Sequence, residues 1–122
     1  MTDIAHAEAD ALRVGIAHHF IGGVYAKSIE FKRGDWAQQH AHTHEHMSVV
    51  ASGFCTVTID GYRFSYGPGS VLKIPAGVAH MVYANTDAVW LCIHATDETD
   101  PAKVDHQLID HHAPPASVSP GL

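Results

Sequence analysis

The sequence predicts a single all-β domain, a sandwich or barrel of short strands that ends in one short helix. Apolar and β-branched runs of four to eight residues recur along most of the chain, with turn residues between them. Asp60 and Gly61 join two of these runs as an Asp-Gly pair, which is the strongest short hairpin signal. The length of 122 residues suits one domain of this kind and leaves no room for two.

Nine strands are expected along the chain, and the turns between them are rich in Gly, Pro and Asp. Residues 67–69 predict one turn and residues 75–77 another. The expected strands are Arg13–His18, Val24–Phe31, Gln38–His42, His46–Ser52, Cys55–Ile59, Tyr62–Tyr66, Val71–Ile74, His80–Ala84 and Val89–His94.

A helix is expected only late in the chain. Asp100 can cap it, and Pro101 suits its first position. Val104 and Leu108 then form a short apolar stripe that we expect to pack against the strands. The predicted organisation is an N-terminal arm (1–11), a β-barrel (12–95), a short helix (96–110) and a tail (111–122). The tail is rich in Pro and Ser, so we expect it to be mobile.

Composition argues against several classes of function. The net charge is −6 with only seven Lys and Arg, whereas nucleic-acid binding needs a basic patch or stripe. No apolar run reaches the length of a membrane span, and the first residues lack the charged and apolar regions of a signal peptide. We therefore expect a cytoplasmic protein with no nucleic-acid or membrane partner.

The two cysteines, Cys55 and Cys92, lie in apolar, β-branched runs. A free Cys in such a run usually behaves as a small buried hydrophobe. A disulfide would be unusual in a reducing compartment. Both are interpreted as buried thiols, and a thiol that lines a pocket stays open as the alternative for Cys92.

Histidines are denser in one segment than folding requires: His40, His42, His44 and His46 alternate there, and His80 follows later in the chain. Neutral imidazole is the commonest metal ligand near neutral pH. On an unbroken strand the four would span roughly 20 Å at about 3.3 Å per residue. Ligands of one metal have Cα atoms only about 6 to 7 Å from it. If they share a metal, the chain must turn between His42 and His46, and His44 then points elsewhere. A solvated surface strand or a loose metal-scavenging tract is the alternative.

The surroundings of these histidines resemble the first motif of the cupin family. That motif is a Gly, five residues, HxH, three or four residues, Glu, six residues and a Gly. Gly34, His40, His42, His46 and Gly53 match its spacing throughout. One substitution departs from it, because His46 stands where the family usually has Glu.

A second cupin motif follows: a Gly, five residues, PxG, two residues, His, three residues and Asn. Gly69, Pro75, Gly77 and His80 match it, and Asn85 lies one residue later than expected. With the flanking strands, the resemblance extends over about residues 12 to 95.

The resemblance implies a small antiparallel β-barrel of the jelly-roll type with a divalent transition metal inside it. The metal ligands that it implies are His40, His42, His46 and His80. Glu45 stays open as a carboxylate alternative to His46. Alternation along the strands would turn three residues inward beside the ligands, namely Ser48, Val50 and Val82. Further candidates for the pocket lining are Tyr25, Cys92 and His94.

An uncharged imidazole set would leave the ion its full double charge and does not select among Fe, Mn, Ni, Cu and Zn. A tetrahedral arrangement of four ligands would close a structural site, and an octahedral one would leave two positions open. Because many cupins are enzymes, the first hypothesis is a metal-dependent oxygenase, isomerase or lyase for a small oxygen-rich or carboxylate substrate, with catalytic residues unassigned.

Two other functions stay open. One is a non-catalytic binder of a metal or a small molecule. The other is a structural or interaction protein with a stabilising metal, which a weaker likeness to small cupins of phages and prophages favours. The family resemblance also implies a homodimer. Fold alone does not choose among these functions.

Overall fold

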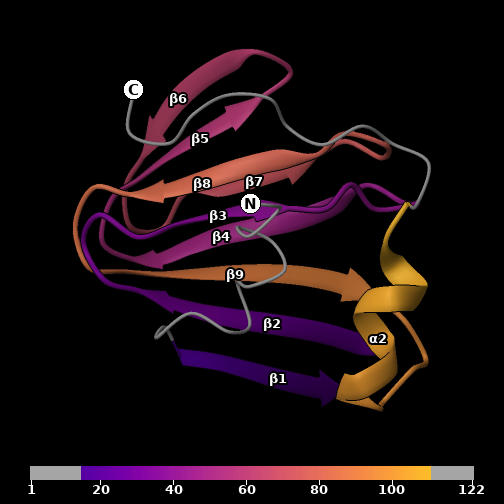
Figure 1. Cartoon of the computed structure of the whole chain (residues 1–122). Helices are drawn as coiled ribbons and strands as arrows, with labels where there is room; N and C mark the ends of the chain where they lie inside the picture. Colours follow the sequence, from indigo (N-terminus) through magenta and orange to yellow (C-terminus); the bar gives the residue numbers. More distant parts are fainter. Residues whose placement is uncertain (1–14, 111–122) are drawn as a thin grey trace.

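The computed structural model describes residues 15–110 and confirms the all-β prediction. In this part of the chain, nine strands form two antiparallel sheets that face each other (Figure 1). One sheet has the order β1-β2-β9-β4-β7 and the other the order β3-β8-β5-β6. The elements are β1 (Gly15–Ile21), β2 (Val24–Phe31), β3 (Trp36–Gln39), β4 (His46–Ser52), β5 (Cys55–Ile59), β6 (Tyr62–Tyr66), β7 (Val71–Ile74), β8 (His80–Ala84), β9 (Ala88–Ala95) and α2 (Pro101–Leu108).

Two hairpins depend on residues that accept left-handed backbone. Asp60 and Gly61 join β5 to β6 with φ angles of 54° and 80°, as a type I′ turn requires. The hairpin predicted from this Asp-Gly pair is therefore confirmed. Gly22 and Gly23 join β1 to β2 with φ angles of 59° and 79°.

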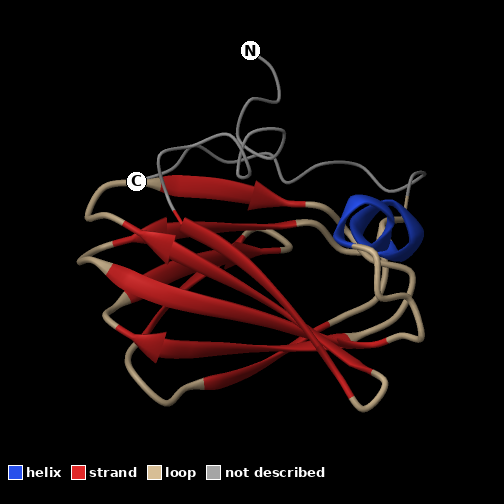
Figure 2. Cartoon of the chain, turned by 90° about the horizontal axis from the view of Figure 1, so that it is seen from below, coloured by secondary structure: helices blue, strands red, loops and turns tan. Residues whose placement is uncertain are grey.

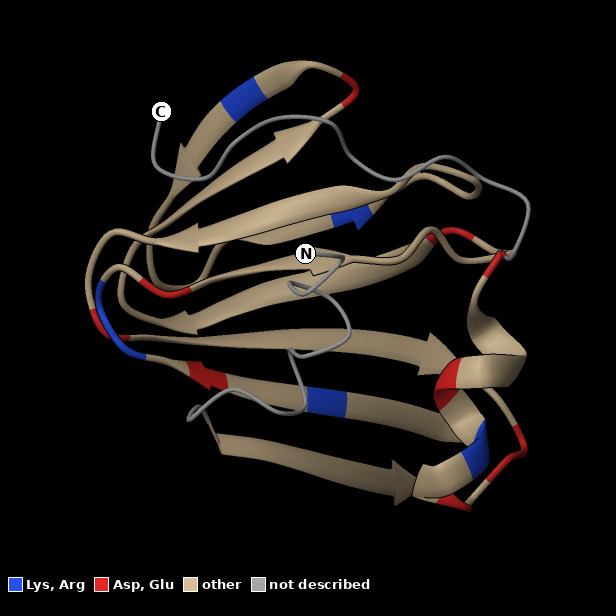
Figure 3. Ribbon diagram, in the orientation of Figure 1, with Lys and Arg blue, Asp and Glu red and all other residues tan. Residues whose placement is uncertain are grey.

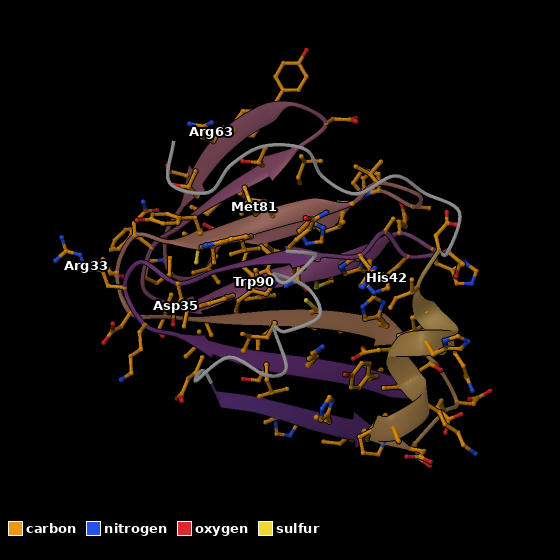
Figure 4. The ribbon with its side chains drawn as sticks, viewed as in Figure 1. Arg33, Asp35, His42, Arg63, Met81 and Trp90 are labelled. Carbon is orange, nitrogen blue, oxygen red and sulfur yellow. The ribbon has the colours of Figure 1, made fainter. Side chains whose placement is uncertain are left out.

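The core lies between the two sheets and is built from alternate residues of each strand. In β9, Ala88, Trp90 and Cys92 are all buried, and the facing sheet contributes Val57 and Val82. Figure 4 shows Trp90 well inside the space between the sheets. Because side chains along a strand alternate between its two faces, every second residue counted from Trp90 along β9 also points inward.

Helix α2 lies against one end of the two sheets (Figure 2). Its start is as predicted: the Asp100 side chain accepts a 2.8 Å hydrogen bond from a backbone N–H of the first turn, and Pro101 is the first helical residue. Val104 and Leu108 are buried and pack with Tyr25 of β2. The apolar stripe of the helix therefore closes this end of the barrel.

Six strands, β2 and β4 to β8, have the predicted bounds. β3 differs from the expected Gln38–His42, because its pairing with β8 runs from Trp36 to Gln39 and ends there. β9 is one residue longer at each end than predicted. β1 continues to Ile21, past the expected end at His18, since it pairs with β2 along its whole length. The predicted arm (1–11) and tail (111–122) lie outside the described residues.

Charged residues are sparse on the strands and gather in the loops and on α2 (Figure 3). At the end of the barrel away from α2, backbone N–H groups donate to acidic side chains: Lys32 to Asp35 at 2.9 Å and Arg33 to Asp87 at 2.8 Å. Figure 4 places Arg33 and Asp35 at that end. Within residues 15–110, no helix has the length and apolar character needed to cross a membrane.

Candidate metal centre

The predicted turn in the histidine segment is present. β3 ends at Gln39, the backbone bends at Thr43 and His44, and β4 begins at His46. His44 lies in this turn and is exposed. His42 and His46 are both buried, at 8% and 7% exposure, and Figure 4 shows His42 at the end of the barrel next to α2. The turn therefore brings these two imidazoles inside.

Backbone hydrogen bonds fix the segment that carries His42. The Gly77 N–H donates to the His42 carbonyl at 2.9 Å, which ties the PxG turn of the second motif to the first motif. Gly77 has a φ of 76°, a conformation that suits glycine. From the other side, the Thr43 N–H donates to the Leu108 carbonyl at 2.9 Å, and His42 forms a β-bridge with Ile109. The position of His42 thus depends on both the barrel and the end of α2.

Three imidazoles from separate segments meet at this end of the barrel: His42, His46 and His94. One ligand nitrogen from each lies within 4.8 Å of the others. The ring centroids are 4.8 Å apart for His42 and His46, 4.5 Å for His42 and His94, and 4.2 Å for His46 and His94. His94 comes from β9, where it continues the inward row of Trp90 and Cys92.

His80 lies beside this group and deeper in the barrel. It is fully buried, with its ring centroid 6.0 Å from that of His46 and 6.3 Å from that of Trp90. It is outside the set of three nitrogens that lie within 4.8 Å of one another. Neither of its ring nitrogens has a hydrogen-bond partner among the described residues.

Burial keeps all four of these imidazoles neutral. It is the main cause that lowers the pKa of each to about 3, and neighbouring imidazoles lower these pKa values further. Among the described residues, His42 Nδ1 and both nitrogens of His46 also lack hydrogen-bond partners. A buried polar atom without a partner costs about 1 to 3 kcal/mol. Folding alone gives no reason to gather such atoms in one place.

The ring spacing fits a shared metal ion. A metal–nitrogen bond of about 2 Å puts each ring centroid roughly 3 Å from the ion. Two rings at a right angle would then be roughly 4.2 Å apart, and two at the tetrahedral angle roughly 4.9 Å apart. The three observed spacings of 4.2 to 4.8 Å fall within this range. The residues present therefore fit a shared divalent transition metal.

A cavity of about 130 Å³ opens beside His42 and His94. Its wall is mostly polar and comes from β2, the end of β3, β9 and the α2 region. The residues that line it are Tyr25, Lys27, Gln38, Gln39, His40, His42, Cys92, His94, Asp105 and Ile109.

The predicted pocket residues divide into two groups. Tyr25, Cys92 and His94 line this cavity. Val50 and Val82 are fully buried in the apolar core instead. Ser48 is also fully buried and lies opposite Cys92 in the pairing of β4 with β9.

Both cysteines are buried free thiols, as predicted. Burial raises the pKa of the Cys55 thiol to about 11 and also raises the pKa of Cys92. The Cys92 sulfur accepts a 3.2 Å hydrogen bond from Trp90 Nε1. Cys92 therefore stays protonated in the wall of the cavity.

A sequence model described as Cupin domain matches residues 28–94, which is more than half of the chain. The chain belongs to the cupin family. Its matched segment contains both motifs, the turn at His44 and all four buried imidazoles. Gly53, the last residue of the first motif, has a φ of 77°, and a side chain there would overlap the backbone of Asp87 and Ala88.

The cupin fold is also seen in solved structures of low sequence identity. KdgF from Halomonas sp. is 18% identical with a TM-score of 0.62, over 71% of this chain and 82% of that one. A cupin superfamily protein from Desulfitobacterium hafniense is 18% identical with a TM-score of 0.61, over 73% and 87%. The cupin domain of Cnp3 from Schizosaccharomyces pombe is 15% identical with a TM-score of 0.58, over 84% and 80%. No curated protein matches the sequence.

Compared with the ligand set that the cupin resemblance implied, the structure brings His42 and His46 together and sets His80 next to them. His40 is exposed and lies at the wall of the cavity, outside the group of three. β3 ends at Gln39, so His40 lies beyond the strand, in the segment that leads to His42. His94, expected only as a pocket residue, is inside the group. The ligand set itself stays a prediction.

Sequence reasoning did not single out Lys27 and Asp105 in the cavity wall. Lys27 occupies an inward position of β2, two residues after Tyr25. The sequence could have indicated the inward position of Lys27, because the apolar residues Tyr25, Ile29 and Phe31 lie at alternate positions of the same strand. Glu45, the alternative carboxylate, is exposed.

Proposed function

We propose that this cupin binds one divalent transition metal through His42, His46 and His94, with His80 as a fourth ligand on the inner side. One observation carries the proposal: three buried imidazoles from separate segments lie in mutual ring contact. The nitrogens without hydrogen-bond partners on His42, His46 and His80 support it. A metal bond would satisfy one nitrogen of each ring, and a neutral ring already offers a free lone pair there, so no proton must leave when the metal binds.

The ligand set favours a particular kind of chemistry. Three or four imidazoles leave the charge of a divalent ion uncompensated, and imidazole suits Zn, Cu, Fe and Ni. When bound, such an ion would act as a Lewis acid toward a carbonyl or carboxylate oxygen. We propose that the cavity beside His42 and His94 holds a small oxygen-rich or carboxylate molecule there. This supports an oxygenase, isomerase or lyase function for the protein.

The residues of the cavity would contribute in different ways. Helix α2 and Tyr25 would restrict the access of water to the cavity. Tyr25 packs against Val104 and Leu108 of the helix and is only 1% exposed. The Tyr25 hydroxyl is 2.7 Å from His18 Nδ1, which fixes the ring against the wall. The Cys92 thiol, protonated and hydrogen-bonded to Trp90, provides a neutral surface. These groups would bind and orient a ligand.

A stabilising metal is the second candidate function, and one contact favours it. His42 forms a β-bridge with Ile109, next to the end of α2. An ion bound by His46 of β4, His94 of β9 and His42 would therefore link these two strands to the segment around Ile109, through the bridge between Ile109 and His42. If this is its only role, metal binding will raise the melting temperature but no small acid will alter the metal's spectrum.

Metal titration tests the proposal. Protein stripped with a chelator should bind one equivalent of Co²⁺ or Zn²⁺, followed by calorimetry and by the visible absorption of cobalt. His46→Ala should weaken binding by on the order of 100-fold or more, since it removes a ligand. His44→Ala is the matched control from the same turn and should bind as the wild type does. Stoichiometric, tight binding by His46→Ala would overturn the assigned site.

A further inference from the structure

Lys27 is a charged residue in an inward-facing row of the barrel. Along β2, Tyr25, Ile29 and Phe31 share its parity, and all three are buried. The Lys27 side chain is only 13% exposed. Because charged side chains are rarely placed inside a barrel without a use, this position calls for an explanation.

We propose that Lys27 is the anion-binding group of the metal site, and that the ligand is a small carboxylic acid such as a 2-oxo acid. Its carboxylate would bond to the Lys27 ammonium, and its remaining oxygens would reach the three-histidine group. The inference rests on the proposed function and names its ligand class.

Lys27 lies close to two of the proposed metal ligands, His42 and His94. Lys27 lies opposite Cys92 in the pairing of β2 with β9, and the neighbouring inward pair of the same two strands is Tyr25 with His94. Lys27, His42 and His94 line the same cavity. The positive charge of Lys27 also lowers the pKa of both His42 and His94, which is consistent with its closeness to them.

The alternative is that Lys27 only holds α2 in place. Its Nζ forms a 3.0 Å ion pair with Asp105 of α2, whose side chain is 32% exposed. Figure 3 shows the basic position on β2 and the acidic position on α2. However, α2 is already attached by buried Val104 and Leu108 and by the backbone bonds around Thr43. The ion pair with Asp105 is therefore not needed to hold the helix.

Charge balance favours an anion in the cavity. Lys27 and Asp105 neutralise each other, so a divalent ion on neutral imidazoles would leave the cavity with two positive charges. The chain as a whole is acidic, with a net charge of −6, so it has little general attraction for an anion. A carboxylic acid would reduce the excess charge and draw Lys27 toward the metal.

The size of the cavity limits the ligand. A cavity of about 150 Å³ in another protein holds a benzene molecule, which has six non-hydrogen atoms. The cavity beside His42 measures about 130 Å³. It therefore suits an acid of about six non-hydrogen atoms, and pyruvate has this size.

Pyruvate and its neutral analogue pyruvamide form a matched pair of probes. Each is titrated into the cobalt-loaded full chain, and the visible spectrum of cobalt reports binding. The wild type should bind pyruvate at least tenfold more tightly than pyruvamide. Lys27→Met should abolish this preference while keeping cobalt, and Lys27→Arg should keep most of it. Lys103→Met, an exposed lysine of α2, is the control and should change nothing.

Asp105→Asn adds an independent test. It removes the negative charge that pairs with the Lys27 ammonium, so it should tighten pyruvate binding several-fold and leave pyruvamide binding unaffected. If Lys27 only anchors α2, Asp105→Asn and Lys27→Met should lower the melting temperature equally and leave the preference for pyruvate intact. That result would overturn the inference while cobalt binding stands. If cobalt does not bind at all, the proposed function and the inference both fail.

Discussion

Acid should destabilise the metal-free protein, because four buried histidines must stay neutral in the fold. The pKa of His42, His46, His80 and His94 falls from about 6.5 to about 3 on folding. The unfolded chain therefore binds more protons than the folded one between these two values. Stability is highest above pH 6.5 and is lost as the pH falls toward 3.

The size of the effect follows from the four pKa values. At pH 5.5, protonation favours the unfolded state by about 1.4 kcal/mol for each histidine that stays neutral in the fold. Four such histidines give about 4 to 6 kcal/mol, once partial solvent screening is allowed for. A domain of this size is usually stable by only about 5 to 15 kcal/mol. The metal-free protein should lose much of its stability by pH 5.5.

Urea denaturation at several pH values after chelation measures this loss. His80→Leu removes one of the four groups, so it should reduce the dependence of the free energy of unfolding on pH by about a quarter. His44→Ala removes an exposed histidine and should leave the dependence unchanged. A free energy of unfolding of the wild type that stays constant between about pH 7 and pH 5.5 would show that the four imidazoles are not buried and neutral in the fold.

Three further predictions concern the framework around the site. Gly53→Ala should destabilise the fold by about 2 kcal/mol or more in urea denaturation, because the added carbon meets the Asp87 backbone. Gly69→Ala is the control: Gly69 also has a positive φ but lies in open space, so this change should cost only about 1 kcal/mol. Asp100→Ala should cost about 1 kcal/mol by the same measurement, since it removes the cap of α2; an unchanged midpoint would mean that the cap contributes nothing. Cys55 and Cys92 should react with a thiol reagent far more slowly in the folded protein than in urea, and rapid labelling of the native state would contradict their burial.

The strands were predictable because their signals are local. In β4, His46, Ser48 and Val50 alternate with exposed or half-buried residues, and the turns on either side are marked in the sequence. The Asp60–Gly61 hairpin was predictable for the same reason, since its backbone demands residues that accept positive φ. β3 was misplaced because its own residues do not decide where it ends; its pairing with β8 does.

The histidine site was predictable only in part. If these histidines share a metal, their spacing requires a turn between His42 and His46, and the structure has a turn there. Spacing within one segment could not bring in a residue from another strand, such as His94, and the choice between His40 and His94 as a ligand stays a prediction. His94 had a readable signal, because Trp90 and Cys92 precede it at alternate positions. Lys27 and Asp105 meet only through the packing of α2, which no local pattern of the sequence records.

A paired cobalt titration compares His94, which lies in the group of three imidazoles and is a proposed ligand, with His40, which lies outside that group. His94→Ala and His40→Ala are titrated with Co²⁺ side by side with the wild type. We predict that His94→Ala weakens cobalt binding by on the order of 100-fold or more and that His40→Ala changes it by less than about threefold. The reverse order, with His40→Ala losing cobalt and His94→Ala keeping it, would contradict the account.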